Sequence, residues 1–225
     1  RDNIRSESLM DDIMKCECGL MYVPWVKDNE AYHSEHHDKW VNGQPILSVS
    51  YERIIGTIGG KDILESSKDL PLPYRAELAK VALLAQRDMS DYPAGYDGSD
   101  EDPEFDSRAY ILRERDRGVG IIILRRRDTF WPFTWNNNRE NIVPHNAVSD
   151  IKRWVVERIW IVSKLRRQNY GKHFIACVAK YLELNVCDFG WELPFTDNGR
   201  LLVKSICPEG FLGTGDLALL DLEQK

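Results

Sequence analysis

The pattern of apolar positions along the chain predicts strands through its middle, with helices around them. Residues 109–112 and 119–124 are apolar at nearly every position and flank a turn at residues 116–118, which predicts a β-hairpin whose second strand is buried on both faces. β-Branched and aromatic side chains fill residues 149–161 and predict a further strand. Residues 46–58 are also β-rich and are followed by two glycines, which indicates two strands or one hairpin.

Helical spacing predicts the elements that cover this sheet. Apolar residues recur every three or four positions after Pro71 and again over residues 173–184, so each run predicts an amphipathic helix. Farther along, we predict a strand at 187–192, a loop at 194–199, a short helix at 201–205 and a closing strand within 211–222. This order of elements predicts a mixed α/β sheet domain.

Several segments outside these elements have distinct compositions. Residues 89–106 are acidic and rich in turn formers, which is typical of a solvated loop or of an acidic rim beside a lysine-bearing substrate. Residues 125–138 are predicted to form a long insertion that interleaves basic and aromatic residues. Such a segment either stacks bases or packs on its own domain, and we favour packing. Residues 1–15 are polar and are expected either to be frayed or to form a short helix at residues 9–14, and residues 44–45 are predicted to be a linker.

A basic turn joins a strand to a helix within residues 156–172. The turn contains a glycine and several cations, Lys164, Arg166, Arg167, Gly171 and Lys172. Such a turn directs the first N–H groups of the helix at a phosphate. An ordinary strand-to-helix connection has the same general pattern, so the turn alone does not decide between the two interpretations.

Composition and charge narrow the class of protein. The 225 residues are 43% apolar with a formal net charge of −6, so a sizeable core is available and general nucleic-acid binding is not expected. We see no apolar run long enough to cross a membrane and no signal-peptide pattern. The five cysteines favour reduced thiols and a metal site over a disulfide framework. We therefore expect a soluble intracellular protein that does not bind membranes.

Two thiols and two imidazoles near the N-terminus have the spacing of a zinc site. Cys16 and Cys18 precede His33 and His37, which lie four residues apart and therefore on one face of a predicted helix. Two thiolates on a turn and two imidazoles on a helix form a tetrahedral zinc site, which stabilises a segment too short to fold by apolar burial.

The spacing of the two thiols departs from that of most fingers. One residue separates them where two are usual, which leaves His36 and Glu30 as alternative ligands to Cys16. The other interpretation is a surface helix with solvated imidazoles, and the combined spacing of the four residues favours zinc.

Together these motifs resemble those of the sister-chromatid cohesion-establishment lysine N-acetyltransferases, which have the GNAT fold. The resemblance covers about residues 16–215 and includes Arg-Ile-Trp-Ile at 158–161 and the turn at 166–171. It also includes the thiols with their histidines, the 109–124 hairpin and residues 191–201. It implies a GNAT-like mixed α/β sheet domain over residues 46–225, preceded over residues 1–45 by a small ββα zinc finger.

The resemblance implies an acetyl-CoA site around the basic turn. The backbone of residues 161–163 would pair with the pantetheine arm as an added strand. Residues 166–171 would hold the pyrophosphate, with Asn169 in a position where the family has glycine and where asparagine tolerates a positive φ. The implied cofactor-binding residues are Ile161, Val162, Ser163, Arg166, Arg167, Gln168, Asn169, Tyr170, Gly171 and Lys172.

Acetyl transfer to a lysine amine needs a base, donors for the thioester oxygen and a partner for the leaving thiolate. Glu157 resembles the catalytic glutamate of histone-acetylating GNAT enzymes, and the alternative is a carboxylate paired with Arg153 or Arg158. Ser163 matches a serine of some family members. The resemblance thus makes Glu157 and Ser163 catalytic candidates.

Three positions depart from the family pattern. Glu192 and Leu193 stand where the family often has serine and then a polar residue, and Ile206 stands where it has a tyrosine that is a candidate thiolate partner. Glu192 is then either a relocated base, and so a third catalytic candidate, or a sign of lost catalysis. We therefore expect a divergent member of the family.

The expected function is acetyl-CoA-dependent protein-lysine N-acetylation in the nucleus, with a structural Zn²⁺ site. By resemblance, the substrate would be a cohesin subunit or another chromatin protein. The alternative is a catalytically weakened GNAT-like domain that binds chromatin or a partner complex through the finger and residues 131–138. Direct DNA binding is expected to be weak or absent, because one finger rarely suffices and the chain is acidic.

Overall fold

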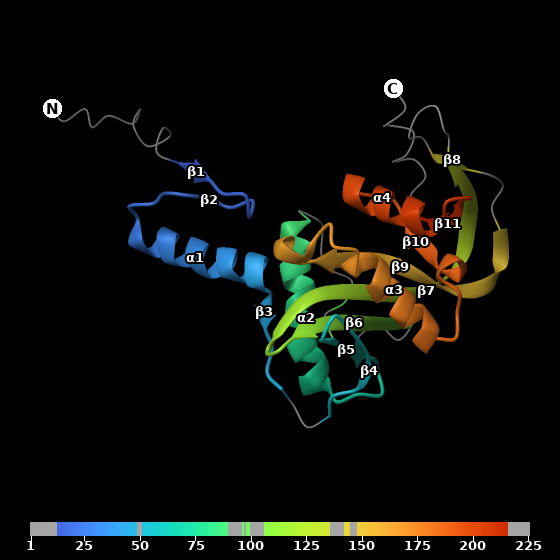
Figure 1. Cartoon of the computed structure of the whole chain (residues 1–225), viewed down its shortest axis with the longest axis horizontal. Helices are drawn as coiled ribbons and strands as arrows, with labels where there is room; N and C mark the ends of the chain where they lie inside the picture. Colours follow the sequence, from blue (N-terminus) through green and yellow to red (C-terminus); the bar gives the residue numbers. More distant parts are fainter. Residues whose placement is uncertain are drawn as a thin grey trace.

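The N-terminal part of the chain is a ββα unit. The computed structural model describes residues 13–48, 51–89, 96, 98–99, 106–135, 142–144 and 148–215. Strand β1 (Met14–Lys15) pairs antiparallel with β2 (Met21–Tyr22), and helix α1 (Lys27–Asn42) follows. Figure 1 shows α1 extending away from the main sheet, which it approaches at its C-terminal end.

The ββα unit agrees with the prediction, but the short helix predicted just before it does not include Met14. Met14 belongs to β1 rather than to the helix predicted at 9–14, and residues 9–12 lie outside the described residues. Few of the unit's described side chains are buried, chiefly Cys18, His36 and Trp40. Apolar burial is therefore too small to hold this unit together, which is the usual situation of a metal-stabilised segment.

The first half of the sheet is antiparallel. It comprises β4 (Ile54–Ile58), β5 (Lys61–Ser66), β6 (Ser107–Glu114) and β7 (Arg117–Trp135). Gly59 and Gly60 join β4 to β5 with φ of 55° and 74°, a conformation that glycine adopts without a steric penalty. The hairpin β6–β7 contains both predicted strands.

Strand β7 is longer than predicted at both ends. The residues predicted as a linker form β3 (Gln44–Pro45), which pairs with the start of β7. At its other end β7 continues through residues 125–135, where we predicted an insertion, and pairs there with β8 (Ile142–Pro144) and β11 (Phe211–Thr214). Phe133 stacks on Phe211 with ring centroids 5.1 Å apart. The aromatic residues of this segment thus pack on their own domain, as favoured, and residues 136–138 lie outside the described residues.

The second half of the sheet contains its parallel strands. Strand β9 (Val148–Ile161) is antiparallel to β7, whereas β10 (Gly190–Glu192) is parallel to both β9 and β11. The path through the sheet is β11-β10-β9-β7-β6-β5-β4. The strand predicted at 187–192 is shorter than expected, because residues 186–188 form a 3₁₀ turn capped by Asn185.

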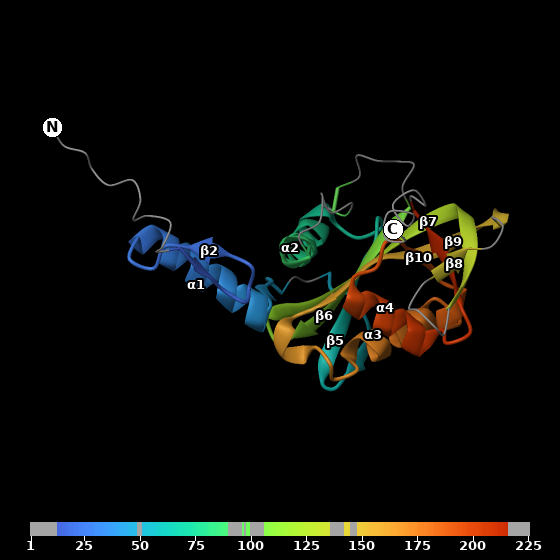
Figure 2. The same ribbon diagram turned by 90° about the horizontal axis from the view of Figure 1, so that it is seen from above.

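Helices lie on both sides of the sheet. Helix α2 (Leu72–Asp88) packs against β5 and β7, and α3 (Tyr170–Tyr181) packs against β4 and β9. Figure 2 shows α2 on the side opposite α3 and α4 (Asp197–Ile206). Helix α4 begins inside the loop predicted at 194–199, since the Thr196 hydroxyl accepts a hydrogen bond from the Gly199 N–H at 3.1 Å and caps it. Within the described parts of the chain, no helix has the length and apolarity to cross a bilayer.

Candidate functional site

The ββα unit brings the four predicted metal ligands together. One ligand atom from each of Cys16, Cys18, His33 and His37 lies within 4.8 Å of all the others. The turn between β1 and β2 is closed by hydrogen bonds from the Cys16 N–H to the Leu20 carbonyl at 2.9 Å and from the Gly19 N–H to the Cys16 carbonyl at 3.0 Å. A tight turn therefore places both thiols toward α1, although only one residue separates them.

The chemistry of this group fits Zn²⁺. Cys16 Sγ lies 3.2 Å from His37 Nδ1, and His33 Nε2 is buried with no hydrogen-bond partner among the described residues. A buried ring nitrogen without a partner is typical of a metal ligand seen without its metal. The Tyr22 ring stacks on His33 with centroids 3.8 Å apart, which fixes the orientation of that imidazole.

The two alternative ligands lie outside this group. Glu30 is exposed on α1, and His36 is buried but is not among the clustered residues. Burial lowers the pKa of His36, so its imidazole is held in the neutral form. The structure therefore favours Cys16 as the fourth ligand.

A second site begins where β10 separates from β9. The two strands pair only at Gly190–Val155 and Trp191–Val156, after which the chain leaves through the Leu193–Pro194 bond, which is cis. Among the described strands, none pairs with the following residues of β9 on that side. Because an unpaired strand edge presents free backbone N–H and C=O groups, it can pair with an extended ligand.

A cavity of about 560 Å³ lies along this open edge. We call it the loop cavity, because the basic turn before α3 forms much of its wall. Its other wall is α4, with Thr196, Asn198 and Leu201 among the lining residues. Of the predicted cofactor-binding residues, it is lined by Ile161, Arg166, Arg167, Asn169, Tyr170, Gly171 and Lys172.

The conformation of the basic turn directs the start of α3 at this cavity. Asn169 has φ of 64°, in the left-handed region predicted for it, and Arg167 has φ of 63°. Among the described residues, no side chain caps the N-terminus of α3, so the first N–H groups of the helix are available to a ligand. An uncapped helix start beside Arg167 and Lys172 is a suitable environment for a phosphate.

Arg166 does not extend outward from the turn. Its Nε donates to the Ile161 carbonyl at 2.8 Å, and its Nη2 donates to Asp88. Val162 is fully buried, and its N–H donates to the Val119 carbonyl at 2.9 Å. The backbone predicted to receive an added strand at residues 161–163 is thus partly occupied, and the open edge lies earlier in β9.

Two other predicted residues also lie outside the loop cavity. Ser163 begins a short 3₁₀ turn (Ser163–Leu165) that packs against α1, so the structure places it beside the ββα unit rather than at a reaction centre. The Gln168 amide donates back to the Lys164 carbonyl at 2.7 Å. Sequence resemblance did not anticipate these local hydrogen bonds.

A second cavity of about 520 Å³ adjoins the first. It contains both Glu157 and Glu192, so we call it the carboxylate cavity. The two cavities share Met89, Ile159 and Thr196 as lining residues. A ligand extending along the open edge of β9 can therefore reach the space beside the two carboxylates.

Glu157 lies at an irregularity of β9 and is paired with an arginine. Arg158 is opposite Ile123 and Val156 is opposite Leu124, so Glu157 is the extra residue of a β-bulge. Its Oε2 lies 3.1 Å from Nε of Arg125 on β7. Glu157 therefore forms an ion pair, and the partner that the structure shows is Arg125 on the neighbouring strand, which the sequence did not predict.

Glu192 has the more reactive environment. Its Oε2 is buried and has no hydrogen-bond partner among the described residues. Burial raises the pKa of Glu192, and the nearby charge of Glu157 raises it further, although Arg127 and Arg125 partly oppose this. A buried carboxylate with a raised pKa can accept a proton from a bound ligand near neutral pH.

Sequence reasoning missed several residues of the site. Asp88, at the end of α2, lines the loop cavity, and Arg125 and Arg127 of β7 line the carboxylate cavity. The arginines belong to a stretch that was predicted as an insertion. Asp88 carried no sequence signal, since a polar residue at the end of a helix is common and its partners lie far away in the chain.

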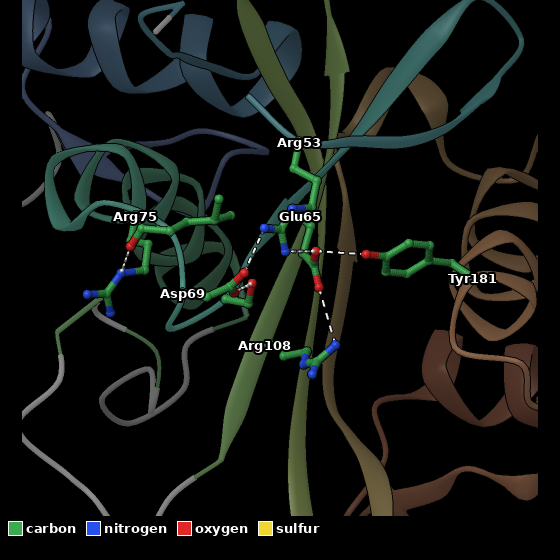
Figure 3. A network of polar contacts seen from close by, with 8 residues as sticks. Arg53, Glu65, Asp69, Arg75, Arg108 and Tyr181 are labelled. Carbon is green, nitrogen blue, oxygen red and sulfur yellow. Dashed lines mark hydrogen bonds and ion pairs between the residues drawn. The ribbon is translucent and has the colours of Figure 1, made fainter. Parts of the chain in front are cut away.

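A separate polar network lies away from both cavities (Figure 3). Glu65 of β5 is fully buried and accepts hydrogen bonds from Arg53 at 3.0 Å, Tyr181 at 3.0 Å and Arg108 at 3.4 Å. Arg53 also pairs with Asp69 at 2.6 Å, which contributes to lowering the pKa of Asp69 to about 2. This network joins β5, β6 and the end of α3, so its role is structural.

Solved structures with the same fold are acetyltransferase domains. The structure of the xEco2 acetyltransferase domain matches 74% of this chain and 98% of its own, with a TM-score of 0.59 and 17% identity. The same domain bound to a lysine–CoA conjugate matches 72% and 96%, with a TM-score of 0.60 and 18% identity. No family model matches the sequence, and no curated protein matches it. At this level of identity the similarity establishes the fold, so the chain has the mixed α/β fold of an acetyltransferase domain preceded by a candidate zinc site.

Proposed function

We propose that this chain is an acetyl-CoA-dependent protein-lysine N-acetyltransferase. The observation that carries the proposal is the junction of two cavities at the open edge of β9. One cavity is bounded by the uncapped start of α3, and the other contains two carboxylates. This arrangement suits a long anionic donor on one side and an amine acceptor on the other.

The loop cavity suits the coenzyme. Free N–H groups at the start of α3, together with Arg167 and Lys172, would bind the pyrophosphate. The open edge of β9 around Ile159 would pair with the amide groups of the pantetheine arm. Because Arg166 is held by Asp88 and Ile161, it shapes the cavity rather than contacting the phosphates.

The carboxylate cavity suits the acceptor amine. A neutral lysine amine attacks the thioester carbon, a C–N bond forms and the C–S bond breaks. Glu192 accepts the proton that the amine loses, directly or through a water molecule, and returns it to the leaving thiolate, so that CoA is released as the thiol. Glu157 is held in place by Arg125 and lines the same cavity, where its second carboxylate oxygen can accept a hydrogen bond from the lysine side chain.

The acceptor class and the location of the protein follow by analogy. One similar structure contains a lysine linked to CoA, which supports lysine as the acceptor here. By resemblance, the substrate is a cohesin subunit or another chromatin protein, and the protein acts in the nucleus. Zn²⁺ bound by Cys16, Cys18, His33 and His37 would stabilise the ββα unit and take no part in the reaction.

Acetyl-CoA binding tests the proposal. Acetyl-CoA at about 100 times its Kd should stabilise the chain by about 2.7 kcal/mol, and this is measured as a rise in Tm. A Gly171→Asp change at the start of α3 should abolish this rise, because a carboxylate would repel the pyrophosphate. The same change favours the helix itself, so a loss of binding would not reflect unfolding.

The matched steric control is Gly171→Ala. A methyl group there would meet only Leu202, at an ordinary contact distance of 3.5 Å. We expect a much smaller loss of affinity than for the aspartate. No rise in Tm for the unchanged protein at millimolar acetyl-CoA would overturn the proposal.

A second candidate is a catalytically weakened domain that serves as a binding module. Two observations favour it: Glu157 is engaged by Arg125, and Ile206 packs against the core and lines neither cavity. Acetyl-CoA binding without transfer to histones, to cohesin subunits or to the chain itself would support this candidate over the enzyme.

A further inference from the structure

Asp88 lies where three parts of the molecule meet. Its carboxylate accepts hydrogen bonds from the indole N–H of Trp40 on α1, from that of Trp160 on β9 at 2.6 Å, and from Arg166 in the basic turn. Both indoles are almost fully buried. A single carboxylate therefore satisfies donors from the ββα unit, the central strand and the turn before α3.

The contact with Arg166 determines the shape of the loop cavity. The same guanidinium donates to the Ile161 carbonyl at 2.8 Å and lies 6.0 Å from the Trp40 ring. Arg166 thus bridges the turn to the end of β9. If Asp88 lost its charge, Arg166 would lose a charge-assisted hydrogen bond and the turn would be held less firmly.

The hydrogen bond from Trp40 connects Asp88 to the helix that carries two of the candidate zinc ligands. His33, His37 and Trp40 are spaced by four and three residues on α1 and therefore share one face of that helix. The rings of His37 and Trp40 lie 5.8 Å apart. A metal bound by His33 and His37 would fix the rotation of α1, and this rotation would aim the Trp40 N–H at Asp88.

We propose that Asp88 is a positioning residue that couples the ββα unit to the cofactor turn, so that zinc binding and acetyl-CoA binding strengthen each other. This inference rests on the proposed function, because it assigns the loop cavity to acetyl-CoA. The path is short and continuous, running from His37 through Trp40 and Asp88 to Arg166. By thermodynamic linkage, the factor by which zinc tightens acetyl-CoA binding equals the factor by which acetyl-CoA tightens zinc binding.

The experiment measures the effect of zinc on acetyl-CoA affinity and the effect of acetyl-CoA on zinc affinity. The Kd of acetyl-CoA is determined by calorimetry on zinc-loaded protein and on protein treated with a chelator. The zinc affinity is determined by competition with a colorimetric chelator, with and without saturating acetyl-CoA. We expect the two ratios to agree and to be about fivefold or more.

Two variants identify the path. Asp88→Asn should reduce both ratios to about one, while each ligand still binds. Trp40→Phe removes the indole N–H that the ββα unit donates to Asp88 but leaves the hydrogen bond between Arg166 and Asp88. This variant should therefore also abolish the coupling. Asp38 also lies on α1 and pairs with Arg117 of β7 at 2.8 Å. Asp38→Asn breaks this pair and is the matched control, which should retain the coupling.

Each outcome has a defined meaning. Equal acetyl-CoA affinity of zinc-loaded and zinc-free protein, or unchanged coupling in both Asp88→Asn and Trp40→Phe, would overturn the inference and leave the proposed function intact. A protein that binds no acetyl-CoA in any state would overturn both. If Asp88→Asn failed to fold, the Trp40→Phe ratios would decide.

Discussion

At the scale of single residues, Glu192 has the clearest chemical consequence. Its carboxylate is buried in the carboxylate cavity, and burial raises its pKa above the ordinary value of 4.5. The ionised form is the base, so the rate of transfer should rise as the pH rises through this elevated pKa. Glu192→Gln should lower kcat by about 10²–10⁴ and remove this rising limb of the pH–rate profile. A variant that kept the limb would assign the base elsewhere.

The same raised pKa predicts an effect on stability of opposite sign. Between its unfolded and folded pKa values, Glu192 binds more protons in the folded chain, so its contribution to stability falls as the pH rises through this window. Glu192→Gln removes the titrating group and therefore this decrease of stability with rising pH. The difference in the free energy of unfolding between variant and unchanged protein should therefore grow in favour of the variant from acidic to neutral pH, as measured by urea denaturation.

Arg167 combines backbone strain with a candidate role in binding. Its φ of 63° lies in the left-handed region, which disfavours most side chains by roughly 1–2 kcal/mol. Arg167→Gly and Arg167→Ala both remove the charge and should weaken acetyl-CoA binding by a similar factor, about tenfold. Only glycine relieves the backbone strain, so the free energy of unfolding of the Arg167→Gly variant should exceed that of Arg167→Ala by about 1 kcal/mol. Equal stability of the two variants would contradict this account.

At the scale of elements, the Glu65 network fastens the end of α3 to the sheet. Glu65→Gln should destabilise the chain by about 2–3 kcal/mol, because it removes the buried charge that pairs with Arg53 and Arg108. We expect a smaller loss of stability than for a fully buried ion pair, because the side chains of Arg53 and Arg108 are 39% and 34% exposed.

The matched control for this network is Tyr181→Phe, which removes one hydrogen bond to Glu65 and should cost about 1 kcal/mol. Both values come from chemical denaturation. The network shares no lining residue with either cavity of the site, so acetyl-CoA affinity should not change. A larger loss in the tyrosine variant than in the glutamate variant would show that the network is held differently.

The elements that the sequence predicted well are those set by local patterns. The hairpin of β6 and β7, the strand β9 and the helices α2 and α3 all follow from apolar periodicity. The left-handed conformation of Asn169 followed from the residue type and its family position. The grouping of the thiols and imidazoles followed from their spacing.

The features that were not predicted depend on partners far away in the chain. The extension of β7 to Trp135 is stabilised by pairing with β11, which lies about eighty residues later. The pairing of Glu157 with Arg125, and the convergence of Trp40, Trp160 and Arg166 on Asp88, likewise join distant segments. A single sequence contains no local signal for such contacts.

At the scale of the whole molecule, the ββα unit and the sheet should differ in what holds them together. The sheet has a continuous apolar core, which includes Phe133, Trp160 and Trp191, whereas the described part of the ββα unit buries few side chains. Removing zinc should therefore unfold α1 while the sheet stays folded. The measurements are metal analysis, with about one zinc per chain expected, circular dichroism for the loss of helix, and limited proteolysis within residues 13–45.

Single cysteine variants test this division of the molecule. Cys16→Ala should lose zinc and show the proteolytic pattern of the chelated protein, because it removes one of the four clustered ligands. Cys187→Ala removes an exposed thiol outside the cluster and should keep both zinc and α1. Zinc retained in Cys16→Ala would indicate another fourth ligand, such as His36. Unfolding of the sheet together with α1 would show that the two parts form one cooperative unit, in which the contacts of Asp88 contribute to stability as well as to coupling.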